Sequence, residues 1–382
     1  EGGFCWKRSG MRTKLKHRWS VGHNYLTGIT FGKWMRLLAQ NGFRVSPAYL
    51  HRAAFITAAS LPNSAFAAIE KLRFGRAIDA ARITRPPLFI LGHWRSGTTH
   101  LHDLLACDRA QFQFANTYRV VNPLTFLTTE NLATRLFSWL VPPKRPMDNM
   151  ALSFASPQED EFAPLLMSLS SLYLGISFPA RQDHYDRQLS FRGAGPAEVA
   201  AWKHALLTFC KKLSLNDDRA LLLKSPPHTA RIRTLLEVFP DARFVHIHRD
   251  PYRVFQSQRH FFDTAGWYTY LQRSDLDAID EGILTRHETM YDAYFEDLPL
   301  IPKGRFCEIG FDALEADPVG QIASIYAQLG LDGFDRMRPD LVAYLAGLRG
   351  YEKNRFTGLD APTRALVARR WRRSFQTWGY PE

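Results

Sequence analysis

Residues 87–101 read PLFILGHWRSGTTHL, and this stretch decides the fold. Leu88 to Leu91 form a short apolar run, which is typical of a buried parallel strand. The run ends at Gly92, and a helical pattern follows over residues 98–106. A strand, a turn that contains glycine and a helix in this order predict the first unit of a parallel α/β sheet.

Three further apolar runs follow the same plan, and each precedes a helical pattern. They comprise residues 220–223, 243–248 and 305–309. The alternation of strands and helices predicts an α/β fold with a P-loop-type central parallel sheet flanked by helices. Two long helical stretches, residues 109–219 and 261–300, interrupt the alternation. We expect these insertions to cap the carboxyl edge of the sheet, where ligands bind in open α/β folds.

The chain divides by composition into a basic, mostly helical extension (residues 1–85) and an α/β domain (residues 86–382). The chain does not begin with Met, and a start at Met11 would make residues 1–10 non-native. Residues 2–69 hold ten Lys and Arg and no Asp or Glu, which leaves only +2 of the net charge of +12 for the remainder. We therefore expect no nucleic-acid surface. Peripheral contact of residues 2–69 with an anionic membrane and a solvated arm both remain open.

One early helical face bears on the membrane question. Phe31, Trp34, Leu37 and Leu38 fall on this face, and such a face either rests on a bilayer surface or, more commonly, packs on its own domain. The chain has no apolar run long enough to span a bilayer. Its four cysteines are far apart, without metal-binding spacing, which favours a reducing compartment. We expect a cytoplasmic protein, at most peripheral to the inner membrane face.

The turn from Gly92 to Gly97 occupies the place of a phosphate-binding loop. N–H groups at a helix start have no intrahelical partners, and together with the helix dipole they attract anions. In the loop that binds nucleoside triphosphates, a lysine follows the second glycine and the next residue holds Mg²⁺. Here Thr98 takes the lysine position, and the cation comes earlier, at Arg95. This pattern disfavours a nucleotide kinase or NTPase, which we keep as an alternative.

A second anion-binding element follows the strand at residues 243–248. Arg249 ends that strand, and Ser257 lies two helical turns further on, so both side chains can face one crevice. A guanidinium and a hydroxyl suit a terminal phosphate. The alternatives are an ion pair with Asp250 for Arg249, and a hydrogen bond to a helix carbonyl for Ser257.

These two elements carry a resemblance to a known family. Residues 87–101 resemble the 5′-phosphosulfate loop of sulfotransferases that use 3′-phosphoadenosine-5′-phosphosulfate (PAPS), whose core reads Arg/Lys-Ser-Gly-Thr-Thr. Arg249 and Ser257 resemble the family's 3′-phosphate motif. Residues 311–331 are similar to a late strand–loop–helix unit of the family.

The resemblance covers about residues 86–379. Residues 142–149 and 156–161 look like those of bacterial-type members of the superfamily. The resemblance implies that the donor is PAPS and that no metal takes part. It also implies the following donor-binding residues: Arg95, Ser96, Gly97, Thr98, Thr99, Arg249, Ser257 and, from a late basic loop, Arg355.

Sulfuryl transfer resembles phosphoryl transfer, so positioning and cationic stabilisation should dominate catalysis. Arg95 and Lys224, which ends the neighbouring strand, are expected to reach the leaving oxygen. An acceptor hydroxyl also needs a base. The candidates are Glu159, Asp160, Glu161 and His228, and we prefer the acidic cluster. Glu159 has a structural alternative, because Ser156 and Pro157 before it predict a capped helix start.

The acceptor cannot be read from the sequence. A small molecule, a saccharide or a lipid with a hydroxyl or an amine would each fit, and the basic extension favours a lipid-linked acceptor. A non-catalytic, membrane-associated protein that binds the nucleotide is the remaining alternative.

Overall fold

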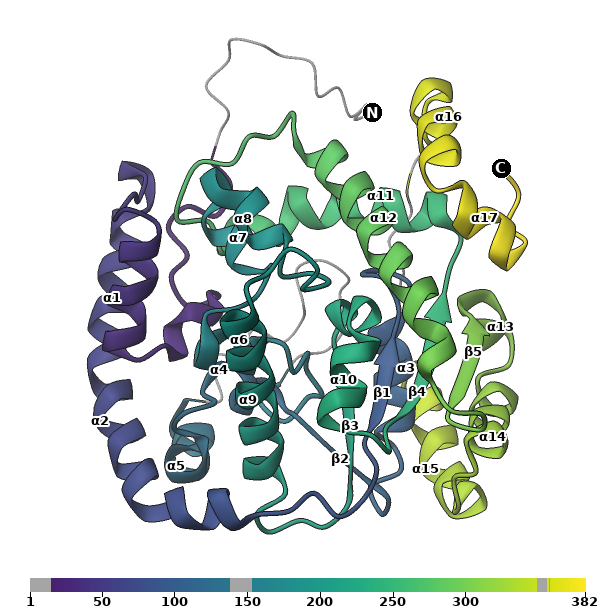
Figure 1. The fold of residues 1–382 in the computed structure, drawn as a ribbon, viewed down its shortest axis with the longest axis horizontal. Coiled ribbons are helices and arrows are strands. Elements are labelled where there is room, and N and C mark those ends of the chain that lie inside the picture. The colour runs from purple at the N-terminus through teal and green to yellow at the C-terminus, as the bar shows by residue number, and fades with distance from the viewer. Residues whose placement is uncertain (1–14, 138–152, 349–355, 357) are drawn as a thin grey trace.

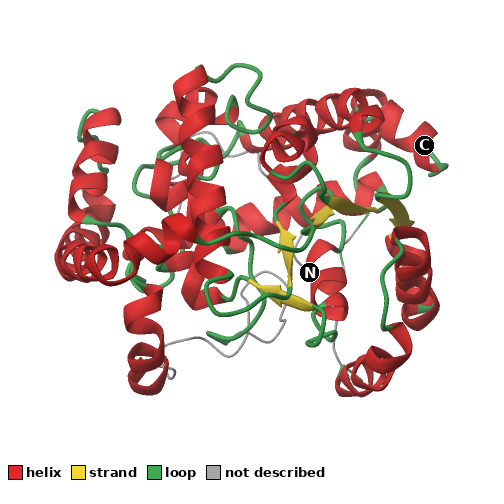
Figure 2. Cartoon of the chain, turned by 60° about the horizontal axis from the view of Figure 1, so that its bottom comes forward, coloured by secondary structure: helices red, strands yellow, loops and turns green. Residues whose placement is uncertain are grey.

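The computed structural model describes residues 15–137, 153–348, 356 and 358–382. Its centre is a sheet of five parallel strands in the order β2-β3-β1-β4-β5. The strands are β1 (Leu88–Leu91), β2 (Phe112–Phe114), β3 (Ala220–Lys224), β4 (Arg243–His248) and β5 (Phe306–Gly310). Figure 2 shows these strands surrounded by helices, so the α/β class and the parallel sheet are confirmed.

The described helices account for most of the remaining chain (Figure 1). They are α1 (Phe31–Gln40), α2 (Leu50–Ala80), α3 (Thr98–Leu105), α4 (Thr117–Val121), α5 (Phe126–Phe137), α6 (Phe162–Ser168), α7 (Leu174–Ser177), α8 (Gln182–Asp186), α9 (Pro196–Leu213), α10 (Ile232–Val238), α11 (Pro251–Thr264), α12 (Ile279–Asp297), α13 (Phe311–Ala316), α14 (Pro318–Leu329), α15 (Phe334–Gly347), α16 (Ala361–Arg370) and α17 (Arg372–Trp378). None of them, within the described part of the chain, is both long and apolar enough to cross a bilayer.

Strand β1 is buried on both faces, because successive side chains of a strand point to opposite sides. Leu88 and Ile90 pack with α3, α14 and α15 in one core, and Phe89 and Leu91 pack with α9 and α10 in another. A strand that is apolar on both faces is what a central parallel strand requires. The two cores hold the carboxyl ends of β1, β3 and β4 in one rigid layer.

The N-terminal helices pack against the insertion. Trp34 and Leu37 of α1 are fully buried in a third core, together with Leu165 and Leu166 of α6. The apolar face of α1 therefore packs largely on its own domain. Of the two interpretations, packing on the domain or resting on a bilayer, the structure supports the first. In Figure 1, α1 and α2 stand along one side of the molecule, at the left.

The structure corrects two expectations. The edge strand β2 was missed, because three residues give too short a pattern to distinguish a strand from a loop. The helix expected to start at Ser156 and Pro157 was wrong, since α6 begins at Phe162. Pro157 instead forms an isolated bridge with Asn116, and the segment from 153 to 161 is irregular. Glu159 is therefore not held by a capping box.

Candidate functional site

The turn between β1 and α3 bends sharply at three residues with positive φ. Gly92 has φ 147°, Arg95 has φ 72° and Gly97 has φ 104°. A Cβ at Gly92 would lie 2.6 Å from the Ile247 carbonyl oxygen, and one at Gly97 would overlap the ring of Phe311. Both positions therefore need glycine. Arg95 adopts the left-handed conformation without being glycine, a strain that is typical of functional loops.

Hydrogen bonds within the loop and to the segment after β3 hold the loop in place. The Gly92 N–H donates to Thr229 Oγ1 at 2.7 Å, and Ser96 Oγ donates to the His93 carbonyl at 2.8 Å. Thr229 lies on a short 3₁₀ helix, Pro226–Ala230, that follows β3. Burial lowers the pKa of His93 to about 3, so the ring is neutral and its Nδ1–H donates to the Trp94 carbonyl at 2.9 Å. These hydrogen bonds hold the loop in its curved shape.

The loop and the second predicted element lie side by side. Arg249, directly after β4, donates from NH1 to the Arg95 carbonyl at 3.3 Å. Its guanidinium carbon lies 4.1 Å from the centre of the Phe311 ring, the ring that packs on Gly97. Arg95 donates from Nε to Ser257 Oγ at 2.9 Å. The structure therefore brings Arg95, Arg249 and Ser257 together, as the two motifs predicted.

Burial lowers the pKa of Arg249, while the carboxylates of Glu315 and Asp312 raise it and Arg95 lowers it again. Arginine titrates so far above neutral pH that its charge survives this shift. The guanidiniums of Arg95 and Arg249 lie close enough for Arg95 to lower the pKa of Arg249, and an anion bound between them would reduce their repulsion. This end of the loop is consequently prepared for a ligand with a negative charge.

Lys224, at the end of β3, lies on the other side of the loop. Its buried Nζ donates to Glu159 Oε1 at 3.1 Å and to Thr99 Oγ1 at 3.4 Å. The Glu159 side chain keeps 15% of its surface exposed. The sequence predicted that Arg95 and Lys224 would both reach the leaving oxygen of the donor, and this stays a prediction. In the structure Arg95 contacts Ser257, and Lys224 contacts Glu159.

Tyr173 completes this cluster and was not found from the sequence. Its hydroxyl donates to Glu159 Oε2 at 2.5 Å and accepts from Trp94 Nε1 at 2.7 Å. Burial, reinforced by Glu159, raises the pKa of Tyr173 well above its usual value, so the phenol stays a donor. No local pattern marks this tyrosine, because the insertion brings it to the loop from a distant part of the chain. Glu159 is thus held on both oxygens.

Asp160 and His228 form a separate pair. Asp160 Oδ2 and His228 Nε2 lie 2.6 Å apart, and both side chains are almost completely buried. Burial would raise the pKa of the Asp160 carboxyl, but the charge and hydrogen bond of His228 outweigh it, and the pKa is lowered. The pair is closed to solvent, so neither group is well placed to meet an acceptor.

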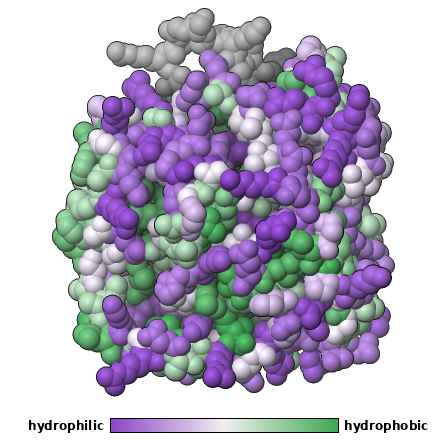
Figure 3. All heavy atoms as spheres, in the orientation of Figure 1, coloured by the Kyte–Doolittle hydropathy of each residue, from purple (hydrophilic) through white to green (hydrophobic). Residues whose placement is uncertain are grey.

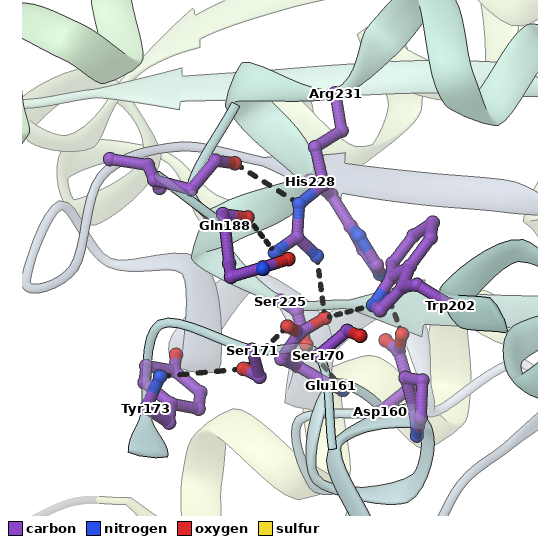
Figure 4. Close-up of polar contacts among 12 residues, drawn as sticks. Asp160, Glu161, Ser170, Ser171, Tyr173, Gln188, Trp202, Ser225, His228 and Arg231 are labelled. Atoms are coloured by element: carbon purple, nitrogen blue, oxygen red, sulfur yellow. Dashed lines mark hydrogen bonds and ion pairs between the residues drawn. The ribbon is translucent and has the colours of Figure 1, made fainter. Parts of the chain in front are cut away.

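Glu161 lies in a buried network, which Figure 4 shows together with the Asp160–His228 pair. Glu161 Oε2 accepts from Arg231 NH1 at 2.7 Å and from Trp202 Nε1 at 3.1 Å, and Oε1 accepts from Ser171 at 2.7 Å. Arg231 also donates to the carbonyls of Leu189 and Gln188. Since Glu161 and Arg231 are fully buried, they fasten the insertion to the sheet.

Two sequence predictions concern residues that the structure does not describe. Arg355 and residues 142–149 lie outside the described residues. Next to Arg355, the Phe356 ring packs on His260 of α11 at 5.7 Å. Among the described residues, no group of three or more His, Cys, Asp or Glu side chains is arranged to hold a metal ion.

Comparison with known proteins adds an independent line of evidence. A model described as the sulfotransferase family matches residues 86–336. The omega-hydroxy-beta-dihydromenaquinone-9 sulfotransferases Stf3 of Mycobacterium bovis and Mycobacterium tuberculosis are 36% identical over 373 residues, which cover 98% of this chain and 95% of each relative.

Two solved structures share the fold over nearly the whole chain. Sulfotransferase STF9 from Mycobacterium avium has a TM-score of 0.67 at 19% identity and covers 97% of this chain and 98% of its own. Sulfotransferase STF1 from Mycobacterium tuberculosis H37Rv has a TM-score of 0.61 at 18% identity and covers 94% of both chains. The architecture therefore extends through the N-terminal helices.

Proposed function

The chain belongs to the sulfotransferase family and is a sulfotransferase, and from this premise we propose that it takes the sulfuryl group from PAPS. One observation carries the donor assignment. Arg249 bonds to the Arg95 backbone and stacks on the ring that closes on Gly97, so two anion-binding elements adjoin. An adenosine bisphosphate carries one anionic group at each end and would span both elements. The mycobacterial relatives, which are named as sulfotransferases, do not favour the two alternatives. These alternatives are a nucleotide kinase or NTPase and a non-catalytic nucleotide-binding protein.

The loop residues Ser96, Gly97, Thr98 and Thr99 would hold the 5′-phosphosulfate. The open backbone at Gly97 and the start of α3 supply N–H groups for it. Arg249 and Ser257 would hold the 3′-phosphate, with Arg95 between the two ends of the nucleotide. Arg95 is always charged and donates no proton at neutral pH, so its role would be electrostatic.

Glu159 is the base candidate that the geometry supports. Of the four candidates, Asp160, Glu161 and His228 are fully enclosed, whereas Glu159 is partly exposed and lies beside the loop through Lys224. In the proposed reaction, Glu159 takes the proton of the acceptor hydroxyl as its oxygen attacks sulfur. The new oxygen–sulfur bond forms while the bond from sulfur to the phosphate oxygen breaks, and the electron pair leaves with 3′-phosphoadenosine-5′-phosphate (PAP).

Lys224 and Arg95 would stabilise the charge that grows on the departing phosphate oxygen. Preorganised cations of this kind typically contribute about 10²–10³ to the rate. Lys224 lies between Glu159 and Thr99, so one ammonium would contact both the base and the loop. With these two cations in place, the proposed mechanism needs no metal ion.

We propose a lipid-like acceptor that carries a hydroxyl, in preference to a saccharide or a water-soluble small molecule. The support is the curated relatives, whose names identify them as sulfotransferases of a hydroxylated menaquinone. A lipid acceptor would be met at a membrane surface, so peripheral contact of the N-terminal region with an anionic membrane, on its cytoplasmic side, belongs to the same proposal.

A transfer assay with ³⁵S-labelled PAPS tests this function. The purified protein is incubated with quinone-containing lipid extracts, saccharides and phenols, and the Arg95→Ala variant serves as control. We expect label in the lipid fraction and at least about a hundredfold less of it with Arg95→Ala. Label confined to a water-soluble fraction would overturn the lipid assignment, and transfer from ATP with Mg²⁺ would overturn the donor assignment.

A further inference from the structure

Helix α2 has an outer face without polar side chains over about four turns. Every exposed residue between Ala54 and Ile69 is apolar: Ala54, Phe55, Ala58, Leu61, Pro62, Ala65, Phe66, Ala68 and Ile69. Leu61 is 55% exposed, and Leu72, one turn beyond Ile69, is 87% exposed. Figure 3 shows apolar residues along the edge of the molecule where α1 and α2 stand in Figure 1.

The inner face of α2 is mixed in character. Its buried side chains are two isoleucines, Ile56 and Ile78, and three polar groups, Arg52, Ser60 and Glu70, and Glu70 forms a buried ion pair with Lys212 of α9. A surface helix normally turns its apolar stripe inward and its polar residues to water. In α2 much of the apolar surface points outward instead, which is the arrangement of a helix with an apolar partner outside the protein.

Basic residues lie at the C-terminal end of this face. Lys71, Arg73 and Arg76 are exposed, and none of them forms an ion pair with a carboxylate among the described residues. Asp79 is the exposed acidic residue of the helix. The face is therefore apolar in its middle and carries a surplus of positive charge at this end.

The N-terminal end carries a tryptophan and further basic groups. Trp19 is 71% exposed, its ring lies 5.1 Å from that of His51, and Arg18 stacks on it at 4.4 Å. Leu50, next to His51, is 55% exposed. Tryptophan with an exposed ring and a neighbouring cation is typical of side chains at the level of lipid headgroups.

We propose that this outer face of α2, from Leu50 to Arg76, is a membrane-docking surface that lies in the plane of an anionic bilayer. Leu61, Phe66, Ile69 and Leu72 enter the boundary between headgroups and acyl chains. Lys71, Arg73 and Arg76 contact anionic headgroups. The helix lies on the membrane and does not span it.

Charge selects the bilayer over a second copy of this chain. A two-fold contact between α2 helices would place basic ends against one another, and the exposed Asp79 offsets only one of the three exposed positive charges, Lys71, Arg73 and Arg76, at its end of the helix. Anionic lipid supplies the opposite charge at both ends of the face. An apolar face between two basic ends is therefore better suited to an anionic bilayer than to the same face of a second copy.

The inference deepens the proposed function, since it names the surface from which a lipid acceptor would be met. It is tested without the reaction, so it can fail while the donor and transfer assignments stand. Conversely, an enzyme that docks on vesicles but sulfates only a water-soluble acceptor would refute the lipid acceptor and leave this surface intact.

Flotation of the full chain with vesicles is the test. We expect binding to vesicles of phosphatidylcholine with about one-third phosphatidylglycerol, and weaker binding to phosphatidylcholine alone. The double variant Leu61→Glu/Ile69→Glu should lower the bound fraction at least about tenfold. Leu300→Glu/Val342→Glu changes two similarly exposed apolar residues outside α2 and should bind as the unaltered protein does.

Charge and folding are tested in parallel. Arg73→Glu/Arg76→Glu should remove the preference for anionic vesicles, and salt should weaken the binding of the unaltered protein. All variants should keep the thermal stabilisation by PAP, which shows that they are folded. Absence of vesicle binding, or binding that Leu61→Glu/Ile69→Glu leaves unchanged, overturns the proposal. A dimer that this variant dissociates, without vesicle binding, assigns the face to a second copy.

Discussion

The two halves of the carboxyl edge of the sheet differ in how their charged side chains are paired. Beyond β3, three consecutive carboxylates each face a basic side chain: Glu159 lies 3.1 Å from Lys224, Asp160 2.6 Å from His228 and Glu161 2.7 Å from Arg231. In the other half, which we call the β4 half, Arg95 from the turn after β1 and Arg249 directly after β4 contact a hydroxyl, a carbonyl and an aromatic ring. In the β3 half each basic group is paired with one carboxylate, whereas the β4 half brings two guanidiniums together, with the carboxylates of Glu315 and Asp312 near Arg249.

The β3 half itself is graded by burial. The Glu159 side chain is 15% exposed, Asp160 1% and Glu161 0%. In the proposed mechanism the outermost carboxylate, Glu159, takes a proton from the acceptor, while the two inner pairs connect the insertion to the segment after β3 and take no part in the reaction. Under the proposed mechanism, three adjacent carboxylates divide into one chemical role and two structural roles, and substitutions should separate these roles.

The largest effect is expected for Glu159→Gln. Loss of the base should lower kcat by about 10²–10⁴-fold, because the acceptor proton has no other partly exposed carboxylate of this cluster to go to. Thermal stabilisation by PAP should persist, since Glu159 belongs to the β3 half. Steady-state kinetics and a thermal shift measure the two properties, and a variant with normal kcat would end the assignment of this base.

Arg231→Met is expected to lose much of the protein's stability, although Arg231 has no proposed role in the reaction. Removing one partner of a buried ion pair costs about 3–5 kcal/mol of unfolding free energy, because Glu161 is left unpaired. Arg233→Met is the matched control, since its ion pair with Asp297 is largely exposed at Arg233 and such pairs contribute about 0–1 kcal/mol. Urea unfolding measures both. Equal losses would contradict the structural role assigned to the buried Arg231–Glu161 pair.

An intermediate effect is expected for Tyr173→Phe. The variant removes a hydrogen bond to a carboxylate, worth about 1.5–3 kcal/mol, so kcat should fall about tenfold or more while KM for PAPS stays unchanged. Tyr118→Phe, which loses a hydroxyl bonded to Thr129, is the control. If kcat of Tyr173→Phe equals that of the control, Tyr173 does not position Glu159.

The smallest effect is a pH dependence at Asp160. The folded-state pKa of Asp160 lies below its ordinary value of 3.8, so the pair stabilises the fold above that value and the contribution is lost as pH falls through the folded pKa. The stability deficit of Asp160→Asn should therefore be greatest near neutral pH and shrink in acid. Urea titrations at several pH values measure it, and a constant deficit would refute the linkage.

The sequence predicted the β4 half better than the β3 half, for a physical reason. The loop, Arg249 and Ser257 lie within strand–turn–helix units, where local spacing fixes which side chains share an edge. Glu159 and Tyr173 come from an irregular insertion, whose path depends on long-range packing. The capping box expected at Ser156 failed for this reason, because its residues bond to the 116–118 segment and not to a new helix.

The central claim is that the β4 half binds the anionic nucleotide independently of the β3 half. Calorimetric titration of PAP into Arg249→Ala and Glu159→Gln tests it most directly. We predict that Arg249→Ala weakens binding by about tenfold or more, through the loss of a charge-assisted contact, and that Glu159→Gln binds as the unaltered protein does. Unchanged affinity in Arg249→Ala, or an equal loss in both variants, would contradict the account.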